Sequence, residues 1–232
     1  MFKHRHYTKE MLDEENIPKH LLFRNLKELE IINIRLGGHA VSLKGLKTIL
    51  TNRTKTYKIA DIGCGGGDSI KAMSNYTSKQ RIKANYIGID LKEDCIEYTI
   101  ENCKNIPSLT LYKDDFRNVF TYEKDIDIVH ASLFCHHFKE DEIAGFIKAC
   151  SQNGSIFIIN DLERNPFAHY SIKWITKLFS KSPLVKNDAP LSVLRGFKRT
   201  EWESIIKAAG IKKYSIQNKW AFRHLVIIYP NE

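Results

Sequence analysis

The sequence predicts a doubly wound α/β protein, and three observations support this. Residues 57–62 form a buried strand pattern that breaks into four glycines within five residues and continues as a helix pattern. Strand-like apolar segments then alternate with amphipathic helix patterns along the chain, which favours a parallel sheet. The length of 232 residues is sufficient for one domain with a sizeable core.

The glycine turn is the strongest candidate for a ligand site. Glycines adopt positive φ and lack a Cβ, so the backbone can lie against a ligand, and the following helix N-terminus offers free N–H groups. The dinucleotide fingerprint G-x-G-x-x-G fails because Asp68 occupies its last position. The spacing is instead G-x-G-x-G, with Asp61 two residues before the first glycine. A carboxylate there suits a ligand that carries an ammonium and a sulfonium better than it suits a pyrophosphate.

The stretch Asp61-Ile62-Gly63-Cys64-Gly65-Gly66-Gly67 resembles motif I of the class I S-adenosylmethionine-dependent methyltransferases. The resemblance implies a Rossmann-like, seven-stranded, mostly parallel sheet with a C-terminal antiparallel hairpin, helices on both faces and an N-terminal helical lid. It implies S-adenosylmethionine as the cofactor. The residues implied to hold its methionine end are Asp61, Gly63, Cys64, Gly65 and Gly67.

Two further turns match cofactor-binding positions of that family. Asp90 ends the second strand, 27 residues after Gly63, where an acid can accept hydrogen bonds from ribose hydroxyls. Leu91 follows it and is placed to pack on the adenine. After the third strand, 109–112, the resemblance implies that Asp115 reads the adenine amino group beside Phe116, with Asp114 as the alternative register.

The fourth strand, 126–131, leads into Ser132-Leu133-Phe134-Cys135-His136-His137-Phe138. Ligands of doubly wound sheets lie outside the carboxyl ends of the strands, so residues 130–137 should line the place where methyl donor and acceptor meet, with Ala131 and Ser132 contacting the cofactor. Histidine exchanges protons near neutral pH, so His136 or His137 is a candidate general base for a phenol or enol. Helix-start histidines bonded to the backbone are the alternative.

Residues 1–52 are expected to form the N-terminal helical lid, and 53–232 the methyltransferase domain. Residues 1–18 have the character of a loosely held lead-in, followed by helices over 19–36 and about 41–50. Helices of this kind often cover the cofactor in the family, so Gly38 and His39 are expected to reach it. The alternative is that Gly37 and Gly38 only end the first helix.

The insertion 162–196 is expected to be the acceptor lid, because it is long for a plain connection. Its middle predicts a helix with lysines on the face opposite to the apolar residues Phe167, Tyr170, Trp174, Ile175, Leu178 and Phe179. Such a helix, over about 167–181, can cap an apolar acceptor pocket, rest on an anionic membrane as a peripheral contact, or pack in the core. The remainder of the insertion has no regular pattern.

Charge and cysteines restrict the partners. The net charge is +9, and residues 162–232 carry 13 Lys and Arg against 5 Asp and Glu. Five cysteines without a C-x-x-C pair predict a reducing, cytoplasmic location, with neither a disulfide framework nor a metal site. The basic N-terminus is followed by no apolar stretch, so no signal peptide is expected, and no apolar run is long enough to cross a bilayer.

The predicted function is methyl transfer from S-adenosylmethionine to a hydrophobic small molecule. Residues 36–39, 132–138, 160–162 and 188–197 resemble methyltransferases encoded beside polyketide and quinone-type pathways of secondary metabolism. That resemblance implies O- or C-methylation of a phenol, quinol or polyketide-like acceptor. The alternatives are an RNA methyltransferase, although the Asn-Pro-Pro-Tyr signature is absent and nucleic acid is not expected, and a non-catalytic cofactor-binding protein. The sequence does not indicate the oligomeric state.

Overall fold

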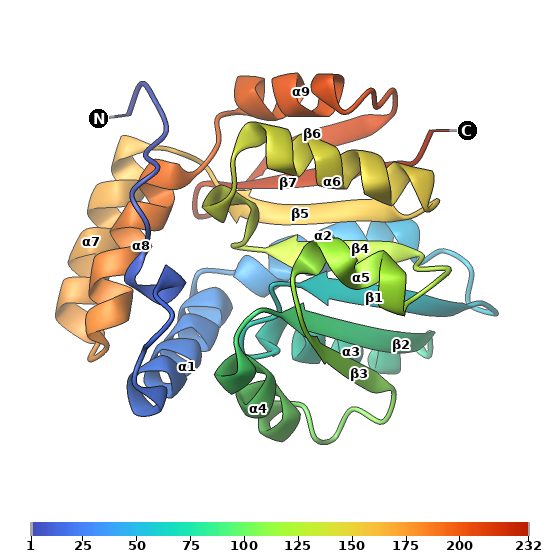
Figure 1. Cartoon of the computed structure of the whole chain (residues 1–232), viewed down its shortest axis with the longest axis horizontal. Coiled ribbons are helices and arrows are strands. Elements are labelled where there is room, and N and C mark those ends of the chain that lie inside the picture. The colour runs from blue at the N-terminus through green and yellow to red at the C-terminus, as the bar shows by residue number, and fades with distance from the viewer. Residues whose placement is uncertain (1, 232) are drawn as a thin grey trace.

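A seven-stranded sheet forms the centre of the computed structural model, which describes residues 2–231 (Figure 1). Its order is β3-β2-β1-β4-β5-β7-β6, and β7 runs antiparallel to both of its neighbours. The expected mostly parallel sheet with a C-terminal hairpin is confirmed. The strands are β1 (Thr56–Ile62), β2 (Lys83–Asp90), β3 (Leu109–Lys113), β4 (Ile128–Ser132), β5 (Ile156–Leu162), β6 (Tyr214–Lys219) and β7 (Arg223–Ile228).

Helices cover both faces of the sheet because successive strand residues point to opposite sides. Ala60 and Ile62 face a core cluster that includes residues of α5 (Val119–Tyr122), α6 (Glu140–Gln152) and α9 (Arg199–Ala208). Tyr57 and Ile59 face a second cluster with residues of α2 (Gly38–Ile49), α3 (Asp68–Gln80) and α4 (Glu93–Asn102). Continuous apolar strands buried on both faces are the expected basis of a parallel sheet.

Three helices lie side by side beyond the carboxyl ends of the parallel strands: α1 (Lys19–Arg35), α7 (Pro166–Phe179) and α8 (Pro183–Arg195) (Figure 1). The expectation of an irregular second half of the insertion was wrong, because α8 occupies it. The Ser182 hydroxyl caps this helix by accepting from Val185 N–H, and Pro183 occupies its first turn. Pro190 lies inside α8, and a proline there normally argues against a helix.

Five large side chains of the predicted apolar face of α7 point outward and Ile175 is half-buried, so this face does not pack in the core. Ala168, His169 and Thr176 form its buried face. Its exposed face carries lysines beside the aromatic residues, and the Lys177 ammonium lies 5.5 Å from the ring centroid of Trp174. The exposed apolar residues of this surface, called here the α7 outer face, are Phe167, Tyr170, Trp174, Leu178 and Phe179.

The segment before α1 is firmly held, so the expectation of a loose lead-in was wrong. Arg5 and Glu10 are buried, and the short helix η1 (Met11–Asp13) packs on α8. These partners lie far along the chain, where sequence patterns do not reveal them. Downstream of α1, α2 packs on β5 and β7, so residues 38–49 belong to a sheet layer. The division into residues 1–52 and 53–232 stays a prediction.

Among residues 2–231, no helix combines the length and the apolar character needed to span a lipid bilayer.

Candidate active site

Two adjoining cavities lie between the carboxyl ends of the strands and the layer of α1, α7 and α8. The larger has a volume of about 980 Å³ and is lined by the glycine turn, the end of β2, the turn after β3 and residues 132–139. The smaller has a volume of about 290 Å³ and lies beneath α7 and α8. Both cavities are lined by Leu133, His136 and His137. The histidine pair therefore stands where the two cavities meet.

The glycine turn after β1 requires glycine for two different reasons. Gly63, Gly65 and Gly67 have φ of 62°, 53° and 73°, which side chains rarely adopt. A Cβ on Gly63 would lie 2.1 Å from the ring of Phe134, so two chain segments touch there. An added Cβ on Gly65 would meet only Leu26 Cδ2, at 3.7 Å, and Gly65 lines the larger cavity, whereas Gly67 does not line it. The half-buried backbone of Gly65 can thus approach a ligand in that cavity.

Asp90 ties the end of β2 to the glycine turn. Its carboxylate accepts hydrogen bonds from Gly65 N–H at 2.9 Å and from Lys92 N–H at 3.0 Å. Burial raises the pKa of Asp90 despite these hydrogen bonds. Each carboxylate oxygen has a second lone pair, and Asp90 lines the larger cavity. This position is compatible with the predicted ribose contact.

Asp61 belongs to a buried polar chain. Its carboxylate pairs with His130 Nδ1 at 2.6 Å, and His130 Nε2 lies 2.8 Å from the hydroxyl of Ser42. Burial raises the pKa of Asp61, although His130 opposes the effect. Asp61 and Cys64 both line the larger cavity. No sequence pattern indicated the contact with His130, which pairs β1 to β4.

Asp68, the residue that breaks the dinucleotide fingerprint, lines the larger cavity and was not among the predicted cofactor residues. It pairs with Asn33 Nδ2 at 2.9 Å and His39 Nε2 at 2.8 Å. Burial would raise the pKa of Asp68, but these contacts outweigh it and lower the pKa. The predicted residues Gly38 and His39 do not line the cavity. Gly38 lies against Asn33 and Arg223, and His39 reaches the cavity wall only through Asp68.

The remaining predicted cofactor residues mostly line the larger cavity, namely Leu91, Asp115, Phe116 and Ser132. Asp115 caps the short helix η2 (Phe116–Asn118) by accepting from Arg117 N–H at 2.9 Å. Asp114 lines the cavity as well, so both registers of the adenine contact stay open. Ala131 is different, because it is 1% exposed within the core and does not line the cavity.

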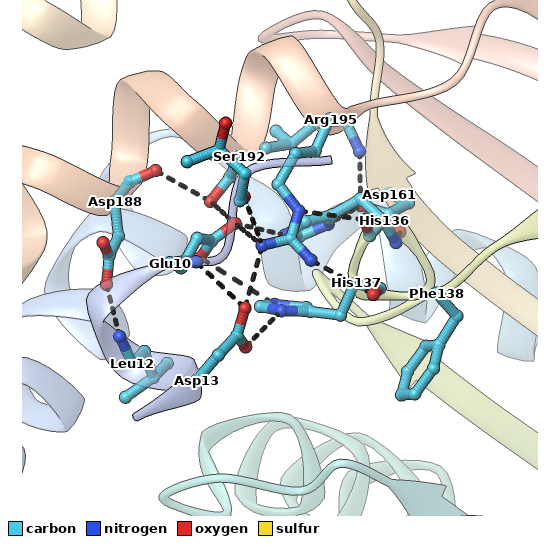
Figure 2. Close-up of polar contacts among 12 residues, drawn as sticks. Glu10, Leu12, Asp13, His136, His137, Phe138, Asp161, Asp188, Ser192 and Arg195 are labelled. Carbon is cyan, nitrogen blue, oxygen red and sulfur yellow. Dashed lines mark hydrogen bonds and ion pairs between the residues drawn. The ribbon is translucent and has the colours of Figure 1, made fainter. Parts of the chain in front are cut away.

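The predicted histidine pair lies in the short helix η3 (Cys135–His137) and faces the N-terminal segment (Figure 2). His136 Nδ1 lies 2.7 Å from Asp161, and His137 Nδ1 lies 2.8 Å from Asp13. The Nε2 atoms of the two rings lie 3.5 Å and 3.9 Å from the two carboxylate oxygens of Glu10. Each imidazole is thus oriented by one carboxylate and directed toward a shared one.

The carboxylates change the charge state of this cluster. Burial alone would lower the pKa of His136, but the charge and hydrogen bond of Asp161, together with Glu10, raise it to about 9. Burial also opposes ionisation of Glu10 and Asp161, but their contacts outweigh it: His136, His137 and Arg195 lower the pKa of Glu10, and His136 with two backbone N–H groups lowers that of Asp161. His136 therefore carries a proton at neutral pH in this arrangement, which does not favour it as a general base.

Two buried arginines hold the histidine turn in place. Arg195 Nη2 donates to the carbonyl of His137 at 3.1 Å, and Arg195 Nη1 donates to Asp13 at 2.9 Å. Arg5 Nη2 donates to the carbonyl of His136 at 3.0 Å. Sequence reasoning missed both arginines and the acids around the pair. Only Asp161 carried a signal, since it lies at the carboxyl end of a buried strand.

Comparisons with known proteins agree with this geometry. Residues 59–153 match the family model described as Methyltransferase domain. A comparison with curated proteins finds no match. Several solved structures share the fold at low sequence identity. The plantazolicin methyltransferase BamL, in complex with a triazolic desmethylPZN analog and SAH, is 14% identical to this chain, with a TM-score of 0.65. The superposition covers 92% of this chain and 94% of the BamL chain.

Two further solved structures show the same likeness. A SAM-dependent methyltransferase from Aquifex aeolicus is 14% identical to this chain, with a TM-score of 0.62. The superposition covers 92% of this chain and 98% of the Aquifex chain. The citrinin polyketide synthase CMeT domain is 15% identical to this chain, with a TM-score of 0.58. The superposition covers 82% of this chain but only 50% of the CMeT chain. At these identities the likeness establishes the fold. Within that fold, residues 59–153 match the model of a methyltransferase domain, and the chain is similar to S-adenosylmethionine-dependent methyltransferases of known structure.

Proposed function

We propose that the protein transfers the methyl group of S-adenosylmethionine to a hydrophobic small molecule, by O- or C-methylation of a phenol, quinol or polyketide-like acceptor. The supporting observation is the junction of the two cavities at the histidine pair. The cofactor would occupy the larger cavity, against the glycine turn and Asp90. The acceptor would occupy the smaller cavity, whose walls are largely aliphatic: Leu29, Ile32, Leu36, Leu162, Ile172, Ile175, Val185 and Val193. Such a pocket suits a secondary metabolite.

The protein's main contribution would be alignment. The sulfonium methyl is already activated, and holding donor and acceptor in line supplies about 7–11 kcal/mol of the barrier in well-oriented systems. The aliphatic walls would exclude water from the junction. Arg5 and Arg195 would hold the histidine turn, and hence the wall between the cavities, in one conformation.

A phenolic acceptor, with a pKa of about 10, must lose its proton during transfer. His137 stays the predicted base, since its side chain is 16% exposed and lines both cavities. His136 is 2% exposed, and its raised pKa keeps it protonated. Asp13 on Nδ1 of His137 would orient the ring so that Nε2 faces the junction.

The test is a screen of phenols, quinols and polyketide-like compounds for S-adenosylhomocysteine formation and methylated product. Ile175→Trp, which fills the acceptor cavity, should raise KM for an active acceptor at least tenfold and leave cofactor affinity unchanged. Trp174→Ser, on the outside of the same helix, is the matched control and should leave KM for a dissolved acceptor unchanged. Cofactor binding without transfer to any acceptor would favour the non-catalytic alternative. Steeply salt-dependent RNA binding would favour the RNA methyltransferase.

We further propose that the α7 outer face rests on an anionic membrane surface as a peripheral contact. Trp174 is 61% exposed and Phe179 is 80% exposed, with Lys173 and Lys177 exposed beside them. Aromatic residues together with lysines suit the interface of an anionic bilayer. A cytoplasmic leaflet agrees with the five unpaired cysteines, which are all buried.

Flotation with phosphatidylserine vesicles tests this contact. Wild type should float with anionic vesicles and less with neutral ones, and Trp174→Ser should reduce binding several-fold. Ser204→Ala, on α9, is the control and should float as wild type does. If wild type shows no preference for vesicles and forms a dimer that Trp174→Ser disrupts, a second copy of this chain covers the face instead.

A further inference from the structure

We propose that Glu10, His136 and His137 form a binding site for one divalent transition-metal ion, at the junction of the two cavities. Figure 2 shows the three side chains converging from the N-terminal segment and the turn after β4. The candidate ligand atoms of the three residues all lie within 4.8 Å of one another.

The spacing of these atoms fits a cation between them. His136 Nε2 lies 3.5 Å from one oxygen of Glu10, and His137 Nε2 lies 3.9 Å from the other. Both distances exceed the 2.7–3.2 Å range of ordinary N–H···O hydrogen bonds. Two ligand atoms on a tetrahedral ion with bonds of about 2.1 Å lie about 3.4 Å apart. The distances between the Glu10 oxygens and the two Nε2 atoms are thus close to the ligand–ligand distance that a shared ion requires.

The second contact of each ring also matches a metal ligand. Histidine ligands commonly donate the other ring N–H to a carboxylate, which fixes the tautomer and leaves a lone pair for the ion. Asp161 takes this position for His136 at 2.7 Å, and Asp13 takes it for His137 at 2.8 Å. Asp161 is itself fixed by the backbone N–H of His136, and Asp13 by Arg195. Both orienting carboxylates are therefore rigidly held.

The charge balance of the cluster favours a divalent cation. Glu10, Asp13 and Asp161 contribute three carboxylates, and the Arg195 guanidinium contacts those of Glu10 and Asp13. A metal ligand must be a neutral imidazole, so His136 would release its proton on binding the ion, and the cluster would then carry two surplus negative charges in a largely buried region. One divalent ion would offset that surplus and the cost of burying it.

Two imidazoles and one carboxylate are a ligand set used for zinc and for other first-row transition metals. Three protein ligands leave at least one coordination position open, and the two histidines line both cavities. The open position would take an oxygen atom of the acceptor, a contact that rests on the proposed function, whereas binding of the ion itself does not. A bound ion lowers the pKa of a coordinated hydroxyl, so that proton would leave to water and His137 would serve as a ligand instead of a base.

Metal binding tests the site directly. Chelator-treated wild type should bind one Zn²⁺ or Co²⁺ per chain in calorimetric titration, and Co²⁺ should give the visible absorption of a low-coordinate N/O site. Glu10→Gln and His137→Gln should each weaken Co²⁺ binding by at least about 100-fold, and Asp161→Asn by about 10–100-fold. His39→Gln is the control, because it alters a histidine–aspartate pair outside the cluster and should leave Co²⁺ affinity unchanged.

The proposal is overturned if folded wild type binds neither ion, or if Glu10→Gln binds Co²⁺ as tightly and with the same spectrum as wild type. Circular dichroism and S-adenosylmethionine titration establish that each variant is folded. The two proposals fail separately. Metal binding without transfer to any acceptor would contradict the proposed function, whereas transfer that persists in a folded protein without metal affinity would contradict the metal site.

Discussion

Gly63→Ala should destabilise the protein and weaken cofactor binding, because it forces two chain segments apart. Gly63 has φ of 62°, and alanine in this left-handed region costs about 1–2 kcal/mol. The added Cβ would lie 2.1 Å from the ring of Phe134, which must move. That ring packs edge-to-face with Phe116 and Phe138 at centroid distances of 5.2 Å and 4.9 Å. Such pairs contribute about 0.5–1.5 kcal/mol each, so the total loss should be about 2–5 kcal/mol.

Gly154→Ala separates backbone strain from the clash. Gly154 has φ of 71°, but an added Cβ would meet nothing within 4 Å. It should therefore cost only the strain of about 1–2 kcal/mol. Each kcal/mol lowers Tm by about 2–4 °C in a chain of this size. The expected decreases are thus about 2–8 °C for Gly154→Ala and about 4–20 °C for Gly63→Ala.

Scanning calorimetry and S-adenosylmethionine titration measure both variants. Gly63→Ala should bind the cofactor at least tenfold more weakly than wild type, since Gly63 and Phe134 both line the larger cavity. Gly154→Ala should bind it as wild type does, because Gly154 is remote from that cavity. Equal Tm decreases and equal cofactor affinity in the two variants would refute the close approach at Gly63 as a determinant of the site.

Asp90→Ala should weaken S-adenosylmethionine binding about 10–100-fold, because one charge-assisted hydrogen bond contributes about 1.5–3 kcal/mol. Calorimetric titration measures the Kd of this variant beside that of the control Asp141→Ala, whose residue is exposed, and a Kd unchanged from wild type would discard the ribose contact. Arg195→Met should destabilise the protein by about 3–5 kcal/mol, because it breaks a buried ion pair. Arg199→Met, which breaks an exposed ion pair, should destabilise it by less than about 1 kcal/mol, and urea unfolding compares the two variants. The lowered pKa of Asp68 stabilises the fold above the unfolded pKa of about 3.9, and this contribution is lost as the pH falls through the folded pKa. In urea unfolding, Asp68→Asn should therefore lose less stability than wild type between pH 5 and pH 2. Equal losses of stability in the two proteins would contradict this linkage.

Much of the fold was predictable because its causes are local. The strand of residues 57–62 and the glycines after it were expected where β1 and its turn lie. Apolar segments likewise placed the third and fourth strands, expected over 109–112 and 126–131, within a few residues of β3 and β4. These signals reflect side-chain alternation and backbone sterics, which act between near neighbours in the chain.

The cofactor half of the site shares this local origin. Asp90 could be proposed from sequence because it ends a strand at a set distance from the glycine turn. Gly38 and His39 could not be placed in this way. Their surroundings include Arg223 of β7 and Asp68 of α3, which approach only after the sheet has formed. The adenine register stays open for a related reason, since Asp114 and Asp115 both line the cavity.

The sequence by itself determined the alternation of strands and helices along the chain, the glycine turn and the acid that follows the second strand. Only the tertiary structure decided that Glu10 and Asp13 meet His136 and His137, more than 120 residues away in the chain. It also decided that the aromatic side of α7 faces outward. The physical reason is that local sterics specify an element and its periodicity. The partner of a buried charge, and the side of a helix that is covered, depend on which distant segments pack against it.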